Sequence, residues 1–468
     1  MSEPGNRPAL DLGDRRSIHI IGIGGAGMSA IATVLVGMGH TVTGSDLKES
    51  AGLERLRSLG IDVRIGHDAD HVGEADAVTI STAIPDRNPE LVAATERGLP
   101  VYRRAEILAA LTAQRRTVAV GGTHGKTTTA SMLALVLVEA GVRPSFVIGG
   151  DVNEIGSGAV WDEGDWFVVE ADESDGTFVE LAAEAVVVTS VEPDHLEHYG
   201  GFDSLVAAFE RFLADAPGPK VVCADDPLAA DLGRAAGAST YGMAADARYR
   251  MVDVELERAS TTFTLLEDGR RLGVVDLPVP GAHNARNAAA AIVAGLQLGA
   301  SFEAGRRALG RFAGVARRFE FRGERDGVTF VDDYAHLPTE IRSVLDAAGA
   351  GGWDRVVCVF QPHRYSRIGA LWREFGPVFA DADLVAVTDV YAAGEPPRPG
   401  VSGKLIVDAV LDAQPWKRVA YLPRRSDLVP YLSAELRGGD LCLTLGAGDL
   451  TVVPDDVQTA LAAAGGEA

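Results

Sequence analysis

The segment GTHGKTTT, residues 122–129, carries the residue types that bind a nucleoside triphosphate. It follows the apolar run 117–121, which predicts a buried strand, and leads into residues 129–141, which predict a helix. A glycine turn between strand and helix exposes backbone N–H groups where the helix dipole is positive, and polyphosphates bind there. Lys126 would add a cation, and the Thr127 hydroxyl would ligate Mg²⁺. The predicted ATP-binding residues of this loop are Gly122, Thr123, His124, Gly125, Lys126, Thr127 and Thr128.

The match to the general phosphate-binding loop is incomplete, because Val120 stands where that loop has its first glycine. The alternative is a glycine-rich turn that carries a surface lysine. The strand and helix on either side favour the phosphate loop. The scarcity of lysine favours it too, since the whole chain contains only Lys48, Lys126, Lys220, Lys404 and Lys417.

A second glycine turn, GIGGAGMS, fits the dinucleotide pattern G-x-G-x-x-G through Gly22, Gly24 and Gly27. It follows a predicted strand over 17–21, opens a helix, and is followed by Asp46 at the end of a second predicted strand. Alone, this pattern indicates an NAD-binding oxidoreductase. Its physical content is a pyrophosphate on a helix N-terminus beside a ribose, which a nucleotide-diphosphate sugar also provides. A tight turn that only serves helix packing is the third alternative.

The acidic segment EADESD begins at Glu170, the last residue of an apolar strand. Ligands of parallel sheets gather at the carboxyl ends of the strands, so Glu170 is placed to hold Mg²⁺ beside Thr127. The alternative is an acidic surface loop. The next strand ends before His195, for which three hypotheses stand: zinc binding with Glu197 and His198, a surface position on a helical turn, or a ligand of a second Mg²⁺.

Three further segments supply polar groups at predicted strand or helix ends. The HNARN segment offers His283, Asn284 and Asn287 to an adenine edge or a ribose, with ordinary helix capping as the alternative. The DDYAHLPTE and QPHRYSR segments each follow an apolar strand. In the second of these, arginine forks suit carboxylates and phosphates, although a salt-bridged surface would have the same composition. The residues in question are His363, Arg364 and Arg367.

The elements that position these groups form an α/β pattern repeated three times along the chain. We predict a Rossmann-like first domain over 1–115, a P-loop ATPase-like central domain over 116–316 with a mostly parallel sheet, and a Rossmann-like third domain over 317–468. Residues 248–278 alternate in polarity around an Asp268-Gly269 turn, which predicts an antiparallel patch. We expect residues after Thr459 to fray.

Composition excludes several classes of protein. The net charge of −23 argues against nucleic acid or an anionic membrane as a general partner. The three cysteines, Cys223, Cys358 and Cys442, lie in separate apolar runs and are expected to be buried thiols. The first residues lack the apolar core of a signal peptide, and no apolar run reaches the roughly 20 residues that span a bilayer. These features predict a cytoplasmic protein without membrane insertion.

Taken together and in order, the motifs resemble those of the Mur ligase family. They are GIGGAGMS, GTHGKTTT, EADESD, EPDH, HNARN, RRFE, DDYAH, QPHRYSR and GAGD. The resemblance implies an ATP- and Mg²⁺-dependent acid–amino-acid ligase of peptidoglycan precursor synthesis. The small-molecule substrates would be UDP-N-acetylmuramate and L-alanine, bound by the first and third domains, with ATP on the central one. A monomer or a homodimer is expected.

The resemblance also assigns roles to residues. The catalytic set would be Lys126, Glu170, His195, His336, His363, Arg364 and Arg367, with Thr127, Glu170 and His195 holding metal. The UDP-sugar set would be Gly22, Gly24, Gly25, Gly27, Met28, Asp46, Ser81 and Ala83. His283, Asn284, Asn287, Arg318 and Asp333 would reach ATP. The family usually has a second histidine where this chain has Leu337, so activity or amino-acid selectivity could differ here.

The nearest alternative is a recycling ligase that joins a whole tripeptide to the same sugar nucleotide. A folylpolyglutamate-like synthetase is disfavoured by GIGGAGMS. An NAD-dependent oxidoreductase would leave Lys126 and Glu170 unexplained, and a regulatory nucleotide-binding protein would leave the basic third-domain loops unexplained. For the ligase we expect the third domain to close over the site about a hinge within 313–318.

Overall fold

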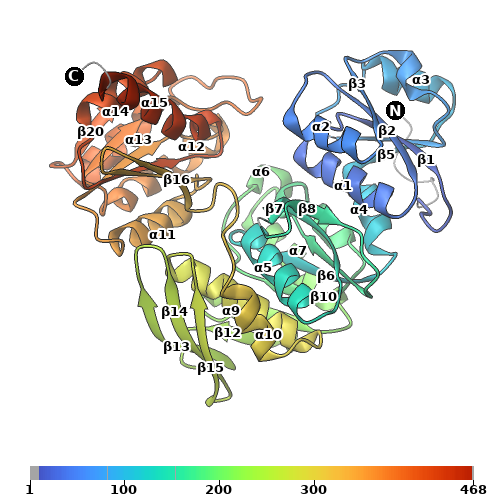
Figure 1. Ribbon diagram of the computed structural model, residues 1–468, viewed down its shortest axis with the longest axis horizontal. Coiled ribbons are helices and arrows are strands. Elements are labelled where there is room, and N and C mark those ends of the chain that lie inside the picture. Colours follow the sequence, from blue (N-terminus) through green and yellow to red (C-terminus); the bar gives the residue numbers. More distant parts are fainter. Residues whose placement is uncertain (1–9, 82, 153, 466–468) are drawn as a thin grey trace. The chain divides into compact units, whose positions relative to one another are not determined.

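The computed structural model describes residues 10–81, 83–152 and 154–465. These residues form three sheets in chain order (Figure 1). The chain divides into two compact units. The first holds the residues up to Val252 with Thr264–Val275 and Arg286–Arg311, and the second holds Asp253–Phe263, Asp276–Ala285 and the residues from Phe312 on.

The first sheet has five strands in the order β3-β2-β1-β4-β5, and every pair is parallel. The strands are β1 (Ser17–Ile21), β2 (Thr41–Asp46), β3 (Asp62–Ile65), β4 (Ala77–Ile80) and β5 (Val101–Arg103). The helices are α1 (Ala26–Gly37), α2 (Ala51–Ser58), α3 (Pro89–Glu96) and α4 (Arg104–Thr112), with a 3₁₀ turn η1 (Ala69–Val72). The predicted strand–turn–helix around GIGGAGMS is confirmed, and β2 ends at Asp46.

The second sheet has ten strands in the order β15-β14-β13-β12-β11-β10-β6-β9-β7-β8. The bounds are β6 (Arg116–Gly121), β7 (Ser145–Val152), β8 (Ser157–Val160), β9 (Trp166–Glu170), β10 (Ala183–Val188), β11 (Lys220–Cys223), β12 (Ser239–Gly242), β13 (Tyr249–Leu256), β14 (Thr261–Glu267) and β15 (Arg270–Leu277). The helices of this region are α5 (Lys126–Glu139), α6 (Leu196–Tyr199), α7 (Phe202–Asp215), α8 (Pro227–Ala235), α9 (Ala282–Gln297) and α10 (Phe302–Leu309). Two 3₁₀ turns, η2 (Glu173–Asp175) and η3 (Thr177–Glu180), follow β9.

Helix α5 begins at Lys126, three positions before the predicted start at Thr129. Gly125 precedes it in the left-handed conformation, with φ +76°, and acts as the N-cap. Since the three threonines that follow are polar and helix-neutral, the apolar pattern alone placed the helix start too late. As a result, Lys126 and Thr127 lie in the first turn of the helix.

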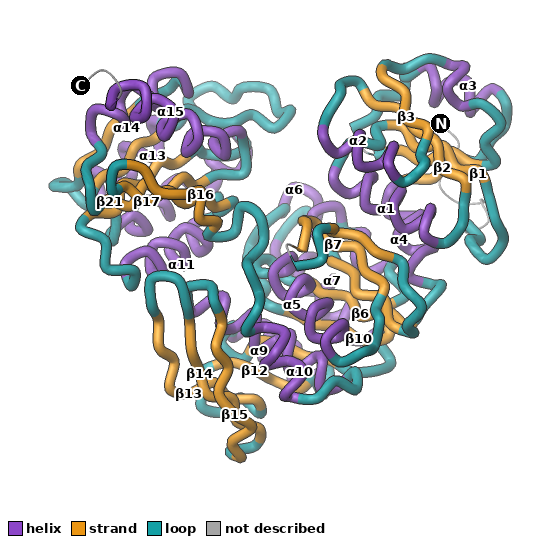
Figure 2. Tube along the Cα trace, viewed as in Figure 1, coloured by secondary structure: helices purple, strands orange, loops and turns teal. Residues whose placement is uncertain are grey.

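The strands β13, β14 and β15 are neighbours in the sheet and appear as adjacent orange strands in Figure 2. β14 and β15 are joined by Asp268 and Gly269, whose φ angles are +48° and +79°. Two residues with positive φ match the tight hairpin turn that twisted antiparallel strands require. The hairpin expected from Asp268-Gly269 is therefore present.

The third sheet has six strands in the order β16-β17-β21-β18-β19-β20. The strands are β16 (Glu320–Arg325), β17 (Val328–Asp333), β18 (Arg355–Phe360), β19 (Leu384–Val387), β20 (Arg418–Tyr421) and β21 (Asp440–Leu445). The helices are α11 (Pro338–Gly349), α12 (Tyr365–Leu371), α13 (Lys404–Ala413), α14 (Leu428–Glu435) and α15 (Val453–Gly465). All pairs are parallel except β16 with β17, which is antiparallel.

The third domain differs from the sequence prediction at two places. The edge strand β16 was not predicted, because its sequence EFRGER is largely exposed and polar and so lacks the apolar signature of a buried parallel strand. The expected fraying after Thr459 is also wrong, since α15 continues to Gly465. Leu461, in the alanine-rich end of that helix, packs against the third-domain core beside the fully buried Val457, which supports the helix there.

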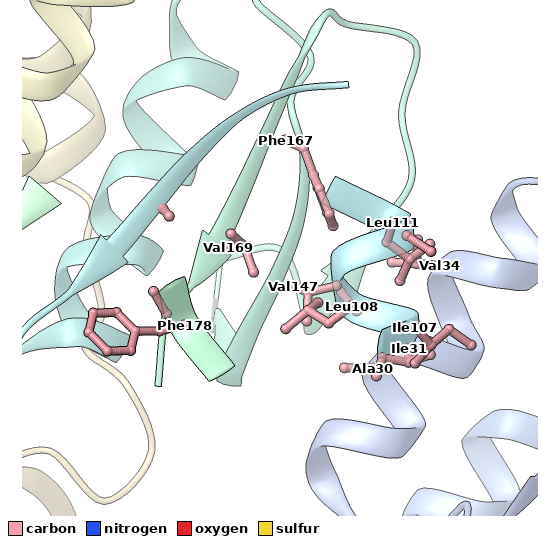
Figure 3. Close-up of a cluster of buried hydrophobic side chains, with 14 of the residues drawn as sticks. Ala30, Ile31, Val34, Ile107, Leu108, Leu111, Val147, Phe167, Val169 and Phe178 are labelled. Carbon is pink, nitrogen blue, oxygen red and sulfur yellow. The ribbon is translucent and has the colours of Figure 1, made fainter. Parts of the chain in front are cut away.

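The core of the first unit is a continuous cluster that includes α1, α4 and the central strands. Figure 3 shows Ile107 and Leu111 of α4 facing Ile31 and Val34 of α1, while Leu108 of α4 lies beside Val147 of β7. These side chains are almost completely buried. The apolar packing of α4 thus joins the helix behind the first glycine turn to the sheet that carries the second.

The three cysteines are buried free thiols, as predicted. Among the described residues, no helix combines the length and apolar character needed to cross a bilayer.

Candidate functional site

The phosphate turn lies between β6 and α5 and leaves no room for side chains at two of its glycines. Gly122 has φ +128°, and a Cβ there would lie 2.1 Å from Thr189 Oγ1. A Cβ on Gly125 would lie 2.5 Å from Asn287 Oδ1. The N-cap residue of α5 is Gly125, which has no side chain. Within the described chain, no side chain therefore caps the N-terminus of this helix from the N-cap position. Backbone N–H groups at an uncapped helix N-terminus can donate hydrogen bonds to a phosphate.

The loop that carries His195 is bonded to this turn. Thr123 N–H donates to the Ser190 carbonyl at 3.0 Å, and His124 N–H donates to Ser190 Oγ at 3.0 Å. Glu192 N–H donates to Thr123 Oγ1 at 2.8 Å. His195 has φ +52° and its Nε2 lies 3.3 Å from Asp194 Oδ2. The structure therefore brings the loop before α6 alongside the phosphate turn, as expected for neighbouring strand ends.

Two predicted metal ligands are in direct contact. The Thr127 hydroxyl donates to Glu170 Oε1 at 2.9 Å, and Gly149 N–H donates to Glu170 Oε2 at 2.8 Å. A hydroxyl and a carboxylate are hard oxygen donors of the kind Mg²⁺ prefers, so these two residues fit that ion. Among the described residues, no group of three or more His, Cys, Asp or Glu side chains is arranged for a metal, which gives the zinc hypothesis no support.

Lys126 is held from several sides. Its Nζ lies 2.7 Å from the Gly122 carbonyl, 2.7 Å from Glu173 Oε2 and 3.0 Å from Glu173 Oε1. Burial acts to lower the pKa of Lys126, but Glu173, Asp172 and Glu170 more than offset this, so the pKa is raised and the ammonium form persists. Burial raises the pKa of Glu173 to about 7, although Lys126 acts in the opposite direction.

The first glycine turn is held by backbone and side-chain contacts. Gly22 and Ile23 both donate to the Ser45 carbonyl, at 2.8 and 3.0 Å. Asp46 Oδ2 accepts from Gly24 N–H at 2.8 Å, so the acid predicted to meet a ribose supports the turn itself. A Cβ on Gly27 would lie 2.6 Å from Arg104 Nε, so the glycine admits the guanidinium of α4.

Other members of the predicted UDP-sugar set gather at the same place. Ser81 Oγ accepts from Ala83 N–H at 3.3 Å, and it lies 3.9 Å from the position that a Cβ on Gly22 would take. Met28 is buried in the first turn of α1, so it contributes to the core rather than an open surface. Gly25 is the N-cap residue of α1, so no side chain caps this helix from the N-cap position.

Sequence reasoning missed a buried cluster beneath this turn. Glu90 is fully buried and lies 2.6 Å from His19 Nε2, 2.7 Å from Ser45 Oγ and 2.8 Å from His67 Nδ1. Burial acts to raise the pKa of Glu90, but hydrogen bonds from His19, Ser45 and His67 outweigh it and lower the pKa. The only sequence signal was Glu90 itself, a charged residue at the start of an apolar helix.

The second unit brings the predicted basic residues into a ring cluster. The His336 and His363 rings lie 5.4 Å apart, and His363 stacks on Tyr391 with centroids 5.7 Å apart. Arg367 Nη1 donates to His363 Nδ1 at 3.1 Å. Burial, with His336 and the arginines adding to it, lowers the pKa of His363 to about 3, so this imidazole is neutral. Arg364 has φ +66° and is fixed by its N–H bond to the Tyr391 carbonyl.

At the start of this unit, Asp333 is buried and accepts from Phe319 N–H and Ala335 N–H, both at 2.7 Å. Burial raises the pKa of Asp333 to about 6, with Arg318 opposing the shift. The Arg318 guanidinium lies 5.2 Å from the centre of the Tyr334 ring. Both residues are thus fixed within their own unit.

Leu337, the position where the family usually has histidine, is the N-cap residue of α11 and is 5% exposed. Glu340 of the same helix accepts from the His336 and Leu337 N–H groups at 2.9 and 3.1 Å. His336 is therefore oriented by a capping carboxylate, whereas the leucine side chain is withdrawn from solvent.

The HNARN residues separate into two roles. Asn287 Oδ1 accepts from the Thr129 hydroxyl at 3.2 Å and lies against the Gly125 turn, so it is part of the phosphate turn. Asn284 is buried and its Nδ2 donates to the Pro280 carbonyl at 2.8 Å. His283 lies beside Gly281, where a Cβ would approach its ring to 2.6 Å.

Three family profiles match the chain in order. They are the Mur ligase family catalytic domain over 17–116, the Mur ligase middle domain over 120–295, and the Mur ligase glutamate ligase domain over 317–448. The chain belongs to the Mur ligase family. It is accordingly an ATP-dependent ligase that forms C–N bonds.

Curated relatives and solved structures agree with this membership. UDP-N-acetylmuramate–L-alanine ligases of Kineococcus radiotolerans and Pelotomaculum thermopropionicum are 49% and 46% identical to the chain. The alignments cover 95% and 93% of this chain, and 96% and 95% of those proteins. The crystal structure of the UDP-N-acetylmuramate-alanine ligase of Thermotoga maritima superposes with a TM-score of 0.81 at 30% identity, covering 96% of this chain and 100% of that one. A murein peptide ligase of Psychrobacter arcticus gives 0.69 at 25% identity, covering 95% and 98%.

Proposed function

We propose that this Mur ligase joins L-alanine to the lactyl carboxylate of UDP-N-acetylmuramate and converts ATP to ADP and phosphate, as a step of peptidoglycan precursor synthesis. The observation that carries the proposal is that Lys126 and Thr127 lie together at the phosphate turn and that Thr127 contacts Glu170 at the end of β9. The choice of substrates is supported by relatives of that name, which are 44% to 49% identical over most of the chain.

The residues divide into three binding regions in this proposal. The region 1–115 holds the UDP part of the sugar nucleotide on the Gly22–Gly27 turn. The region 116–316 holds ATP on the turn before α5. The region 317–468 holds the amino acid near the His336, His363 and Arg367 cluster, where guanidinium groups suit a carboxylate.

The reaction needs activation because a carboxylate is a poor electrophile. A lactyl carboxylate oxygen attacks the γ-phosphorus of ATP, the bond to ADP breaks, and an acyl phosphate forms. The neutral amine of alanine then attacks the acyl carbon, and the tetrahedral intermediate collapses with loss of phosphate. Lys126 stabilises charge on the transferring phosphoryl group, and Arg364 and Arg367 bind the phosphate or the alanine carboxylate.

Thr127 and Glu170 would hold Mg²⁺ with the nucleotide, and His195 would hold a second ion. The metal supplies charge neutralisation at the phosphates when bound. The chain's own contribution is to place a hydroxyl and a carboxylate 2.9 Å apart at the end of β9, next to the first turn of α5.

The test is phosphate release from ATP in the presence of Mg²⁺ and UDP-N-acetylmuramate, with one amino acid added at a time and product mass measured in parallel. L-alanine should give the highest kcat/KM and a product heavier than the sugar nucleotide by one alanine residue. Glycine and L-serine measure how strictly alanine is selected. Turnover only with L-alanyl-γ-D-glutamyl-diaminopimelate would contradict the proposal and assign a recycling ligase.

A further inference from the structure

The ammonium group of Lys126 is already bonded to three groups of the chain. Its three protons face the Gly122 carbonyl at 2.7 Å, the Thr123 carbonyl at 3.4 Å, and the carboxylate of Glu173. The Glu173 contact uses both oxygens, at 2.7 and 3.0 Å. The side chains of Lys126 and Glu173 are 13% and 2% exposed, so water does little to weaken this ion pair.

Glu173 is held in place by its surroundings. The Tyr199 hydroxyl of α6 donates to the Glu173 carbonyl at 2.6 Å. Asp172 Oδ1 accepts from Ser174 N–H at 3.0 Å, and this turn caps the 3₁₀ segment that Glu173 opens. Phe178, just beyond, is buried in the core of the first unit. The backbone of Glu173 is therefore anchored, and the ion pair separates by rotation of the Lys126 or Glu173 side chain.

We propose that Glu173 is a positioning residue that occupies Lys126 in the absence of nucleotide and competes with the phosphates of ATP for it. The inference rests on the proposed function, because it takes ATP as the ligand of the turn. A carboxylate and a γ-phosphate oxygen are both anionic acceptors, and one ammonium group offers three donors. Since two of those donors face turn carbonyls, the phosphate must take the donor or donors that Glu173 holds.

The charges around Glu173 make the competition costly for ATP. Lys126 of α5 is its cationic partner, and Asp172 on the same loop is a nearby like charge. Arg104 of α4 acts on Asp172. When Lys126 turns to a phosphate, Glu173 loses its compensating charge in a buried place, and an isolated buried carboxylate is unfavourable. Its pKa of about 7 is in keeping with a group that can accept a proton at that moment.

The exchange gives Lys126 two defined positions. In the free enzyme the ammonium stays charged and is bonded to the Gly122 carbonyl, the Thr123 carbonyl and Glu173. With ATP present, the same ammonium reaches the β- and γ-phosphates. Affinity for ATP is lower than the turn alone would give, and removal of the competitor should raise it.

The test compares Glu173→Gln with the wild type by calorimetric titration of the non-hydrolysable analogue AMP-PNP in Mg²⁺, and of ADP. Glutamine keeps the size and polarity but removes the charge. AMP-PNP should bind roughly fivefold more tightly to Glu173→Gln, and ADP should gain less because it lacks the γ-phosphate. UDP-N-acetylmuramate affinity and the melting temperature serve as checks that the first unit is intact.

The matched control is Glu180→Gln, which removes one negative charge from an exposed position of the same segment, at the end of η3. It should change AMP-PNP affinity by less than about twofold, because an exposed charge is screened. Should Glu173→Gln fold poorly, Glu173→Asp withdraws the carboxylate by one methylene and should tighten AMP-PNP binding by a smaller factor.

Unchanged or weaker AMP-PNP binding in folded Glu173→Gln or Glu173→Asp would overturn the inference, because a merely structural glutamate gives that result. An equal gain in Glu180→Gln would also overturn it, since general charge would then explain the effect. Wild-type enzyme that binds neither AMP-PNP nor ADP would overturn the proposed function and this inference together.

Discussion

At the scale of single residues, Lys126 is the group on which the proposed reaction depends most. It is nearly buried, stays charged, and lies in the first turn of α5 beside Thr127. Its partners are two carbonyls of its own turn and Glu173 of the segment after β9, and none of them belongs to the first sheet. A change of this side chain should therefore affect ATP chemistry and leave the sugar-nucleotide turn unaffected.

Replacement of Lys126 by alanine should lower kcat by roughly a thousandfold, because a preorganised cation that stabilises the transferring phosphoryl group is lost. UDP-N-acetylmuramate should still bind within about twofold of its wild-type affinity. Steady-state phosphate release and calorimetry measure the two quantities. Lys220→Ala, at the start of β11, is the control and should keep full activity. Joint loss of turnover and sugar-nucleotide binding in Lys126→Ala would contradict separate binding turns.

His363 makes stability depend on pH. The folded chain keeps this imidazole neutral down to pH about 3, whereas the unfolded chain takes up a proton near pH 6.5. Its contribution to the free energy of unfolding is thus complete above pH 6.5 and is lost as the pH falls toward 3. At pH 5 the loss is at most about 2 kcal/mol.

Urea unfolding of the wild type and of His363→Gln at pH 7.5 and pH 5.0 checks this expectation. The wild type should lose more stability between the two values than the variant, by an amount up to that limit. Equal losses in both proteins would show that His363 does not resist protonation in the folded state.

At the scale of elements, the strand–turn–helix from β6 through α5 carries the proposed ATP site. Gly125 and Gly141 lie at the two ends of α5, and their φ angles are +76° and +75°. A Cβ on Gly125 would collide with the Asn287 side chain, whereas a Cβ on Gly141 meets nothing within 4 Å. Substitution by alanine therefore costs both positions the same backbone strain, whereas only position 125 also gains a collision with Asn287.

Gly125→Ala should abolish detectable ATP binding, because the turn must open to relieve both φ and the contact with Asn287. Gly141→Ala should cost about 1 kcal/mol of stability for the left-handed conformation and keep ATP affinity. Thermal unfolding and AMP-PNP titration of both variants test the pair. Similar ATP affinity in the two variants would contradict the role of the tight turn.

The sequence predicted most of these elements and much of the site. The strands β18, β19 and β21 are apolar runs, as is typical of parallel strands that are buried on both faces, so the sequence itself marks them as strands. The contact between Thr127 and Glu170 was expected from the meeting of strand ends. The contact of Glu173 with Lys126 and the histidines around Glu90 could not be predicted. Polar residues that are distant in the sequence and meet only in the fold produce no periodic pattern or fixed spacing by which the pair could be recognised.

At the scale of the whole molecule, the chain forms three sheets one after another, and the three Mur ligase domain profiles match it in the same sequence order. The Gly22–Gly27 turn follows a strand of the first sheet and the phosphate turn follows a strand of the second, and both turns belong to the first compact unit. The cluster of arginines and histidines lies in the second unit. The closure of the third domain about residues 313–318 stays a prediction.

The central claim is that ATP activates the lactyl carboxylate by phosphorylation. In that route one carboxylate oxygen becomes the bridging atom of the acyl phosphate and leaves with the phosphate. The decisive measurement uses UDP-N-acetylmuramate labelled with ¹⁸O in the lactyl carboxylate, turned over with ATP, Mg²⁺ and L-alanine, and mass spectrometry of the released phosphate. Each phosphate from doubly labelled substrate should carry one ¹⁸O atom, and unlabelled phosphate formed alongside alanylated product would contradict the account.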